Sequence, residues 1–381
     1  MTEKLFYQDS YSREFDATVL ECEKSAGGYR AVLDKTAFFP EGGGQYADNG
    51  WLNEVRVTDV HEKNGIIYHT VEEPLEAGES VHGKIRWEER FEKMQQHTGE
   101  HIISGIIHAR FGYENVGFHL GSDYCTMDFN GPVTDDELRE IELEANRAVF
   151  RNLEIEVSYP SKEELETMEY RSKIEIAGQV RIVTVPGYDV CACCAPHVKR
   201  TGEIGMIKLV GMMNYKGGER ITMLAGLRAL RDYVIKDRNT KTISSLLCVK
   251  EYETADAVLH LKEETGSLKG RNASLQQKLL AYRAAEIPIE DGMTVVFDPE
   301  LAGNAPRELM NRLLDRGAGS CAVFAGTDEG GYRYVIGSRK EDVRPYSKML
   351  NEAFGGRGGG KPEMVQGSLA GAEALIRARF R

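Results

Sequence analysis

The sequence predicts a multidomain α+β protein. A small N-terminal β-barrel, an α+β domain with a metal centre, a helical coiled-coil-like linker and a C-terminal α/β domain are expected in that order. Three observations predict this fold class. The chain has 381 residues, more than one hydrophobic core usually supports. Short β-type runs dominate the beginning, whereas leucines at heptad spacing mark a later helix. Two pairs of metal-binding residue types lie between them.

Residues 1–90 are expected to form the barrel, because short β-type runs alternate there with Gly, Asn and Pro. They contain the run T-A-F-F-P-E-G-G-G-Q from Thr36 to Gln45. Its glycines, Gly43 and Gly44 among them, allow the backbone to approach a ligand or another domain closely. A simple hairpin turn would account for the glycines alone. The aromatic residues and proline before them, and the glutamine after them, favour a functional loop.

Residues 91–228 mix helices and strands. The segment Asp135–Arg151 has acidic residues early and arginines late, as a helix dipole favours, so we expect a helix there. Ile155–Tyr159 and Arg181–Val185 are expected to be strands. These elements would make an α+β domain.

The same domain carries the two candidate pairs of metal ligands. His97 and His101 are four residues apart in a segment with helical periodicity, so their imidazoles would lie about 40° apart on one helix face. Cys193 and His197 follow with the spacing C-x-x-x-H. Three nitrogen donors and one sulfur donor suit a tetrahedral Zn²⁺ ion. The sequence therefore predicts one zinc ion per chain.

Other interpretations of these residues stay open at this point. A histidine pair on an apolar helix is often packed and hydrogen-bonded without metal, and neighbouring cysteines could be buried thiols or a redox pair. Cys191 and Cys194 are alternative ligands on spacing alone. The presence of both pairs in one chain favours a shared zinc centre.

Glu100 gives the helix a second possible interpretation. Together with the two histidines it forms H-x-x-E-H, the signature of inverted zinc peptidases, in which the glutamate activates water. Such a peptidase would not use a C-x-x-x-H pair, so the match is interpreted as accidental. Glu100 remains a candidate base beside the metal.

Residues 229–287 are rich in charged helix formers. Leucines recur every seven residues from Leu261 to Leu275, and Leu279 follows four residues later. This spacing is typical of a coiled-coil-like hairpin or of a dimer seam, and we expect a homodimer. An ordinary amphipathic helix packed on its own chain is the alternative, and two glycines within the segment leave the choice open.

Residues 288–381 end in a glycine-rich tract, G-G-R-G-G-G-K, that includes Gly356, Arg357 and Lys361. Exposed N–H groups beside positive charge suit phosphate or carboxylate oxygens. The tract is not a Walker A loop, because the G-K-[ST] ending is absent. The chain carries a net charge of −12, but from residue 331 onward ten basic side chains face five acidic ones. On charge alone, a solvated basic face would explain this excess.

The composition indicates the cellular compartment. No apolar run approaches the roughly 20 residues of a membrane span, and the N-terminal MTEKLFYQDS has neither the basic start nor the apolar core of a signal peptide. Seven cysteines, three of them crowded into four positions, fit a reducing compartment and a metal better than a disulfide framework. We expect a soluble, cytoplasmic protein without a membrane partner.

The motifs together resemble a known family. The run from Thr36 to Gly50, the H-T-G-E-H from His97 and the C-C-A-P-H-V-K-R-T-G-E-I-G from Cys193 are similar, in order and spacing, to the editing region of alanyl-tRNA synthetase and its free-standing AlaX-type relatives. The C-terminal G-G-R-G-G-G-K-P resembles the DHH-associated domain of the long AlaX type. The resemblance covers nearly the whole chain. In place of the family's usual HTAxH, this chain has Gly99 after the threonine.

The resemblance implies a zinc-dependent hydrolase that acts in trans on the tRNA for alanine and removes wrongly attached serine, and secondarily glycine. It implies the ligand set already listed, an editing domain at residues 91–228 and a DHH-associated domain at residues 288–381 that contacts tRNA. Thr36 and Gln45 would border the editing pocket, with Thr36 as the candidate partner of the serine hydroxyl. A non-catalytic, zinc-stabilised tRNA-binding module is the alternative, since four protein ligands resemble a closed structural site.

Overall fold

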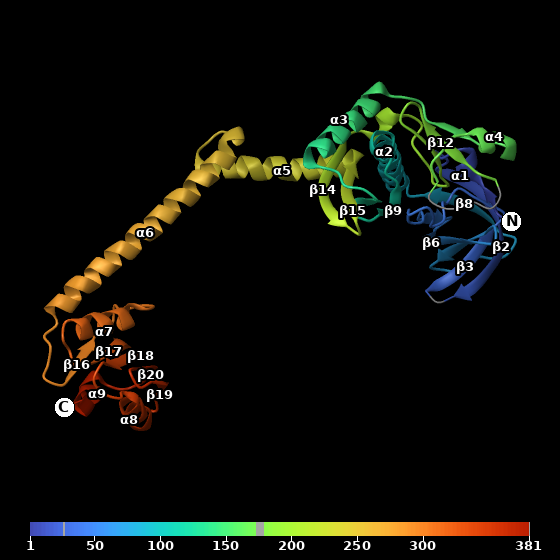
Figure 1. The fold of residues 1–381 in the computed structure, drawn as a ribbon. Helices are drawn as coiled ribbons and strands as arrows, with labels where there is room; N and C mark the ends of the chain where they lie inside the picture. The colour runs from blue at the N-terminus through green and yellow to red at the C-terminus, as the bar shows by residue number, and fades with distance from the viewer. Residues whose placement is uncertain (26, 173–178, 381) are drawn as a thin grey trace. The chain divides into compact units, whose positions relative to one another are not determined.

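The computed structural model describes residues 1–25, 27–172 and 179–380. The chain divides into two compact units, Met1–Thr242 and Ile243–Arg381 (Figure 1). Both mix helices and sheets, as the sequence predicts. In the part of the chain that the structure describes, no helix is both long enough and apolar enough to cross a bilayer.

The first unit begins with a closed barrel in the strand order β2-β3-β7-β6-β5-β8 (Figure 1). Its strands are β2 (Glu14–Ser25), β3 (Gly28–Leu33), β5 (Gly50–Leu52), β6 (Val55–Lys63), β7 (Ile66–Val71) and β8 (Ser80–Ile85). Alternate residues point inward, as a pleated strand requires, so Val81 and Ile85 of β8 are buried while Ser80 and Lys84 are exposed. A short helix, α1 (Leu5–Gln8), and the parallel pair β1 (Glu3–Lys4) and β4 (Lys35–Thr36) complete this part.

The long helix α2 (Trp87–Phe111) follows the barrel directly. It ends at Gly112, whose φ of 72° forms the left-handed cap that glycine adopts without strain. Apolar α2 residues, among them Met94 and Ile103, lie in a core that is shared with the four-stranded sheet β14-β15-β10-β9 and with α3. The bounds of these elements are β9 (Asn115–Leu120), β10 (Cys125–Phe129), α3 (Asp135–Arg151), β14 (Ile207–Tyr215) and β15 (Gly218–Ala225).

Helix α3 has the bounds that its charge pattern predicts. Thr134 and Glu137 form a reciprocal capping box at its start, which satisfies two backbone N–H groups that the first turn leaves open. The predicted strands at 155–159 and 181–185 are confirmed in a second sheet, β11-β12-β13. Its elements and neighbours are β11 (Glu156–Ser158), α4 (Lys162–Thr167), β12 (Ile182–Val185), β13 (Asp189–Ala192) and the 3₁₀ helix η1 (Thr201–Ile204).

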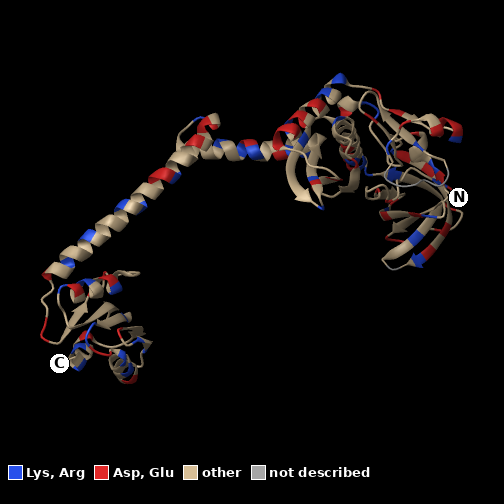
Figure 2. Ribbon diagram, viewed as in Figure 1, with Lys and Arg blue, Asp and Glu red and all other residues tan. Residues whose placement is uncertain are grey.

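Two long helices come next, α5 (Gly226–Leu247) and α6 (Thr254–Glu286), joined through η2 (Glu251–Glu253). Helix α6 is continuous, so its two internal glycines do not break it. The heptad leucines Leu261, Leu268, Leu275 and Leu279 are each about half exposed, at 49% to 63%. Basic and acidic side chains both lie along the helix (Figure 2).

The second unit is built on the five-stranded sheet β16-β17-β18-β20-β19. The bounds are β16 (Met293–Phe297), α7 (Ala305–Asp315), β17 (Ser320–Thr327), β18 (Gly331–Ser338), α8 (Arg344–Phe354), β19 (Arg357–Lys361), β20 (Met364–Leu369), α9 (Glu373–Arg377) and η3 (Ala378–Phe380). One face of the sheet packs against α7 and the end of α6, and the other packs against α8 and α9. Val323 and Phe324, adjacent in β17, accordingly enter different cores.

Candidate metal centre and active site

The structure brings the four predicted ligands together. His97 and His101 project from α2, and Cys193 and His197 follow β13; one ligand atom from each lies within 4.8 Å of all the others. Cys193 Sγ is 3.5 Å from His97 Nε2 and 3.4 Å from His197 Nε2. Bonds of zinc length in a tetrahedron separate donor atoms by roughly 3.3 to 3.8 Å, so these two spacings fit a Zn²⁺ ion.

Each of the three imidazoles is oriented by a hydrogen bond at Nδ1. The acceptors are Gln45 Oε1 for His97 at 3.1 Å, Asp189 Oδ2 for His101 at 2.9 Å and Thr98 Oγ1 for His197 at 3.1 Å. When Nδ1 donates its proton, Nε2 keeps a lone pair for a metal. The donor set and its supporting bonds therefore suit a metal ion that is bound through three Nε2 atoms and one thiolate.

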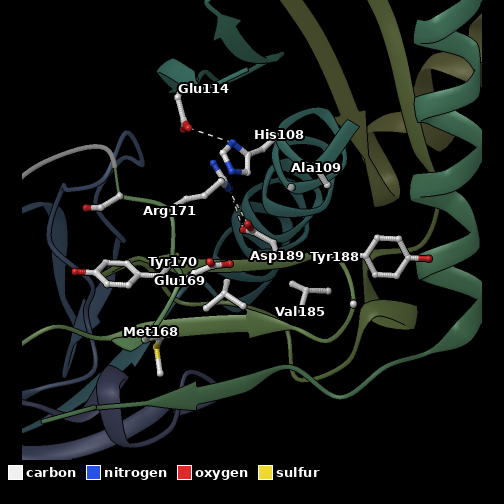
Figure 3. Close-up of a pocket in the computed structure, with 14 residues that line it drawn as sticks. His108, Ala109, Glu114, Met168, Glu169, Tyr170, Arg171, Val185, Tyr188 and Asp189 are labelled. Atoms are coloured by element: carbon white, nitrogen blue, oxygen red, sulfur yellow. Dashed lines mark hydrogen bonds and ion pairs between the residues drawn. The ribbon is translucent and has the colours of Figure 1, made fainter. Parts of the chain in front are cut away.

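Asp189 is the most strongly held of these acceptors. Arg171 donates to both of its oxygens, Nε to Oδ1 at 2.7 Å and Nη2 to Oδ2 at 2.9 Å. Figure 3 shows the two side chains directed at one another, beside a cavity of about 840 Å³. Burial alone would raise the pKa of the Asp189 carboxyl, but the hydrogen bonds from His101 and Arg171 lower it below its usual value. Asp189 is therefore a carboxylate that keeps Nδ1 of His101 protonated.

The three clustered cysteines differ in their environments. Burial by itself would raise the pKa of the Cys193 thiol, but the surrounding histidines lower it well below its usual value. Burial raises the pKa of Cys191 and that of Cys194 to about 11. Cys191 lies in a smaller group with His101 and Asp189, and the Asp189 carboxylate in that group is already occupied by arginine. The geometry and charge therefore favour Cys193 as the thiolate ligand.

The glycine-rich loop lies beside these residues. Gly42 and Gln45 exchange backbone hydrogen bonds of 3.1 and 3.0 Å, and the two glycines between them have positive φ angles of 60° and 79°. This is the geometry of a tight turn in which both central residues are left-handed. A Cβ atom on Gly43 would lie 3.2 Å from Cys194 Sγ, and one on Gly44 would lie 2.7 Å from the carbonyl oxygen of Phe118. The close approach of the loop to Cys194 and Phe118 explains why glycine occupies these two positions. The same turn places Gln45 beside His97.

The other two candidate catalytic residues lie in separate polar clusters. Thr36 is fully buried in the barrel, where its hydroxyl bonds to His69 Nε2 at 2.9 Å and accepts the Phe38 N–H at 3.1 Å. Glu100 is buried in α2, where Oε1 accepts hydrogen bonds from Ser104 and Asn115 at 2.7 and 2.6 Å. Its Oε2 atom lies 3.9 Å from Nε2 of His101.

The C-terminal candidates belong to the second unit. Arg357 and Lys361 are the first and last residues of β19, an exposed edge strand paired with β20, and Gly356 precedes it. Two cavities adjoin this strand. One of about 650 Å³ includes Arg357, and one of about 430 Å³ includes Lys361 together with Arg307 and Arg339.

Sequence reasoning missed several residues that support the site. Thr98 and Asp189 had a detectable signal, because Thr98 lies between the paired histidines and Asp189 is two positions before Cys191. Arg171 had none, since it is remote in sequence from every ligand. No sequence pattern indicated the buried pair Arg90 and Lys93 on α2. Their partners include the carbonyl oxygens of Ala37 and Ala47, which are more than 40 residues away in the sequence.

Comparisons with known proteins show what the chain is similar to. The family model described as threonyl and alanyl tRNA synthetase second additional domain matches residues 180–222, and the model of class II (A) tRNA synthetases matches residues 5–89. The alanyl-tRNA editing protein Aarsd1 of Mus musculus is 29% identical over 98% of this chain and 97% of its own length. The alanyl-tRNA editing protein AlaX-L of Pyrococcus horikoshii is 28% identical over 97% of this chain and 95% of its own length.

A longer relative matches only in part. The alanine–tRNA ligase of Pyrococcus furiosus is 31% identical over 98% of this chain, but the match covers 42% of the ligase. The two editing proteins, in contrast, match over at least 95% of their own length. Over nearly its full length, the chain is similar to the alanyl-tRNA editing proteins.

Proposed function

We propose that the protein is a trans-editing hydrolase, which removes serine, and secondarily glycine, from mischarged tRNA for alanine. One observation carries the proposal: four metal-binding side chains converge beside the glycine-rich loop, with every imidazole oriented by a hydrogen bond. The full-length similarity to alanyl-tRNA editing proteins supports the same conclusion. A cytoplasmic location is part of the proposal, since the crowding of Cys191, Cys193 and Cys194 fits a reducing compartment.

His97, His101, Cys193 and His197 would hold the ion, for which Zn²⁺ is the best match to the donor set. Bound Zn²⁺ supplies positive charge that polarises an ester carbonyl or a water molecule, or anchors the amino group of the substrate. All three histidines are at most 3% exposed, and Cys193 is the most accessible member of the set. The centre is therefore most accessible at Cys193.

Gln45 is the residue of this chain that is best placed to contact the reacting ester. His97 Nδ1 must donate its proton when Nε2 binds metal, so the group that faces it is the amide oxygen of Gln45. The Nε2 group of Gln45 is then buried without a hydrogen-bond partner among the described residues. A buried, unpaired N–H donor favours a ligand oxygen, and it would stabilise the negative charge that develops on the carbonyl oxygen.

Serine recognition is assigned to Thr36. Its hydroxyl donates to His69 and accepts from the Phe38 amide, which leaves one acceptor lone pair. A serine hydroxyl could donate to that lone pair, whereas alanine has no group that could. Discrimination by a polar partner can exceed what shape alone achieves between two small side chains.

Deacylation assays test the proposal. Wild type is expected to hydrolyse seryl-tRNA for alanine fastest, glycyl-tRNA next and alanyl-tRNA slowest. His101→Ala should abolish hydrolysis and lower the zinc content, while His82→Ala, at an exposed histidine of barrel strand β8, should affect neither. Thr36→Val should lose the preference for serine. Binding of the tRNA without any hydrolysis by wild type would establish the rival function, a zinc-stabilised tRNA-binding module.

Gly356, Arg357 and Lys361 are proposed to contact the tRNA backbone outside the acceptor end. The exposed edge strand, the neighbouring arginines and the basic excess after residue 331 support this assignment. Replacing both Arg357 and Lys361 by alanine should weaken tRNA binding and lower the slope of log affinity against log salt by about 1 to 2. Lys348→Ala, on the exposed surface of α8, is the matched control and should leave that slope unchanged.

The heptad leucines of α6 are proposed to form a homodimer seam. Four large apolar side chains at heptad positions are about half exposed, which is the pattern of a helix that pairs with a second copy. Sedimentation equilibrium of wild type should give a dimer. The double variant Leu268→Lys and Leu275→Lys should give a monomer, and a dimer of unchanged affinity would exclude this seam.

A further inference from the structure

The glycine-rich loop is held against α2 by two buried cations that take no part in the candidate metal set. Arg90 and Lys93 precede the ligand His97 by seven and four residues, so all three side chains lie on one face of the helix. Each of the three contacts the polypeptide between residues 37 and 48. One helix face therefore binds the loop at three successive levels.

Arg90 holds the two ends of the loop. Its side chain has no exposed surface. Nη2 donates to the Ala37 carbonyl at 2.7 Å, and Nε donates to Asp48 Oδ2 at 2.7 Å. The same carboxylate oxygen accepts the N–H of Phe39 at 2.8 Å. The guanidinium thus connects the strand entering the loop with the strand leaving it.

Lys93 holds the residues next to Gln45. Its Nζ donates to the carbonyl oxygen of Ala47 at 2.5 Å and lies 3.4 Å from that of Tyr46. It is also 3.8 Å from Asp48 Oδ1, an oxygen that has no hydrogen-bond partner among the described residues. The residue is only 8% exposed, and burial lowers the pKa of its ammonium group.

Joining the loop to the helix through buried charges is energetically unfavourable. Burying an ammonium and a guanidinium against one carboxylate carries a large desolvation cost, and apolar residues of similar volume would stabilise an interface at least as well. Directional bonds to backbone carbonyls do something that apolar contacts cannot do, because they set the position of the loop along the helix. Gln45 comes directly before the two carbonyls that Lys93 binds.

We propose that Arg90 and Lys93 are positioning residues, which fix the glycine-rich loop so that Gln45 meets His97 with its amide oxygen and presents its N–H group to the substrate. The inference rests on the proposed function for its catalytic part. Its structural part, the support of a metal ligand through Gln45, stands without it.

A double-mutant cycle tests the inference. Lys93→Met keeps the length and volume of the side chain but removes its bonds to the loop, while Arg90 still pairs with Asp48, so the chain should fold. Zinc affinity, measured by competition with a chelator, should fall by roughly 10-fold in Gln45→Ala and by a similar factor in Lys93→Met. The double variant should bind zinc no more weakly than Gln45→Ala, because both changes remove one support of His97.

Activity provides the second measurement. Lys93→Met should lower kcat for seryl-tRNA by roughly 10- to 100-fold with little change in KM, since a misplaced donor affects the transition state more than binding. Lys84→Met, an exposed lysine of the barrel, is the control and should match wild type. Independent, multiplicative losses of zinc affinity in the double variant would overturn the inference. Absence of hydrolysis by wild type, with the non-additive zinc result intact, would overturn only the proposed function.

Discussion

Oδ2 of Asp189 lies 2.9 Å from Nδ1 of His101, and the same carboxylate is held by Arg171. We expect Asp189→Asn to weaken zinc binding by roughly 10- to 100-fold, as loss of such support does at other zinc sites. The neutral amide accepts a weaker hydrogen bond, and its NH₂ group would face either the imidazole N–H or the guanidinium donors. Chelator competition measures the affinity. Asp128→Asn, at a partly exposed arginine pair in β10, is the control and should bind zinc as wild type does.

Helix α2 approaches β13 closely at Gly105. A Cβ atom there would collide with the carbonyl oxygen of Tyr188 and lie 2.9 Å from Cβ of Asp189. Gly105→Ala should therefore push β13 away, lower the free energy of unfolding by about 1 to 3 kcal/mol and weaken zinc binding through the lost bond to His101. Calorimetry and chelator competition give the two values.

Gly99 is the matched control on the same helix. The nearest atoms to an added Cβ belong to the side chain of Met223, at 3.3 and 3.4 Å, and a flexible methionine can move. Because alanine favours a helix interior over glycine by up to about 1 kcal/mol, Gly99→Ala should leave the stability unchanged or raise it. A loss equal to that of Gly105→Ala would contradict the assignment of the effect to β13.

At Gly44 the backbone is left-handed, which strains any other residue, and neighbouring atoms leave no room for a side chain. Gly44→Ala would place a Cβ atom 2.7 Å from the Phe118 carbonyl oxygen at a φ of 79°. Gly78→Ala has nearly the same φ, 86°, but nothing within 4 Å of the added atom. Gly78→Ala should lower the free energy of unfolding only by the cost of the left-handed backbone, roughly 1 kcal/mol. Gly44→Ala should lower it further and should also reduce activity. Equal losses in chemical denaturation, with activity intact, would remove crowding as the reason for glycine.

His69 should make the barrel sensitive to acid. Burial lowers its pKa from 6.5 to about 4, since protonation would place a charge in the core. Between these values the unfolded chain binds a proton that the native chain does not bind. The stabilisation is therefore complete above pH 6.5 and declines as the pH falls toward 4, by about 3 kcal/mol in all. Wild type should exceed His69→Gln in stability at pH 7, and denaturant titrations should show the gap narrowing toward pH 4. A constant gap would show that His69 has the same pKa in the folded and unfolded chains.

Several features could be predicted from the sequence because they depend on local periodicity. The helical period places His97 and His101 on one face, and the charge pattern of Asp135–Arg151 lies within the helix itself. The C-x-x-x-H spacing identified the second ligand pair without knowledge of its position. The structure then grouped these two pairs, which are separated by ninety-two residues, around one point.

Only the tertiary structure decided how these groups are supported. Asp189 meets His101, Arg171 meets Asp189, and Lys93 meets the carbonyl oxygens beside Gln45. None of these contacts has a local period or spacing, because each joins segments whose separation along the chain is set by intervening loops. The sequence by itself determined which side chains can bind a metal. The packing of the barrel and of β13 against α2 determined which nitrogen of each histidine is left to bind it, since that choice depends on the acceptor that packing brings to Nδ1.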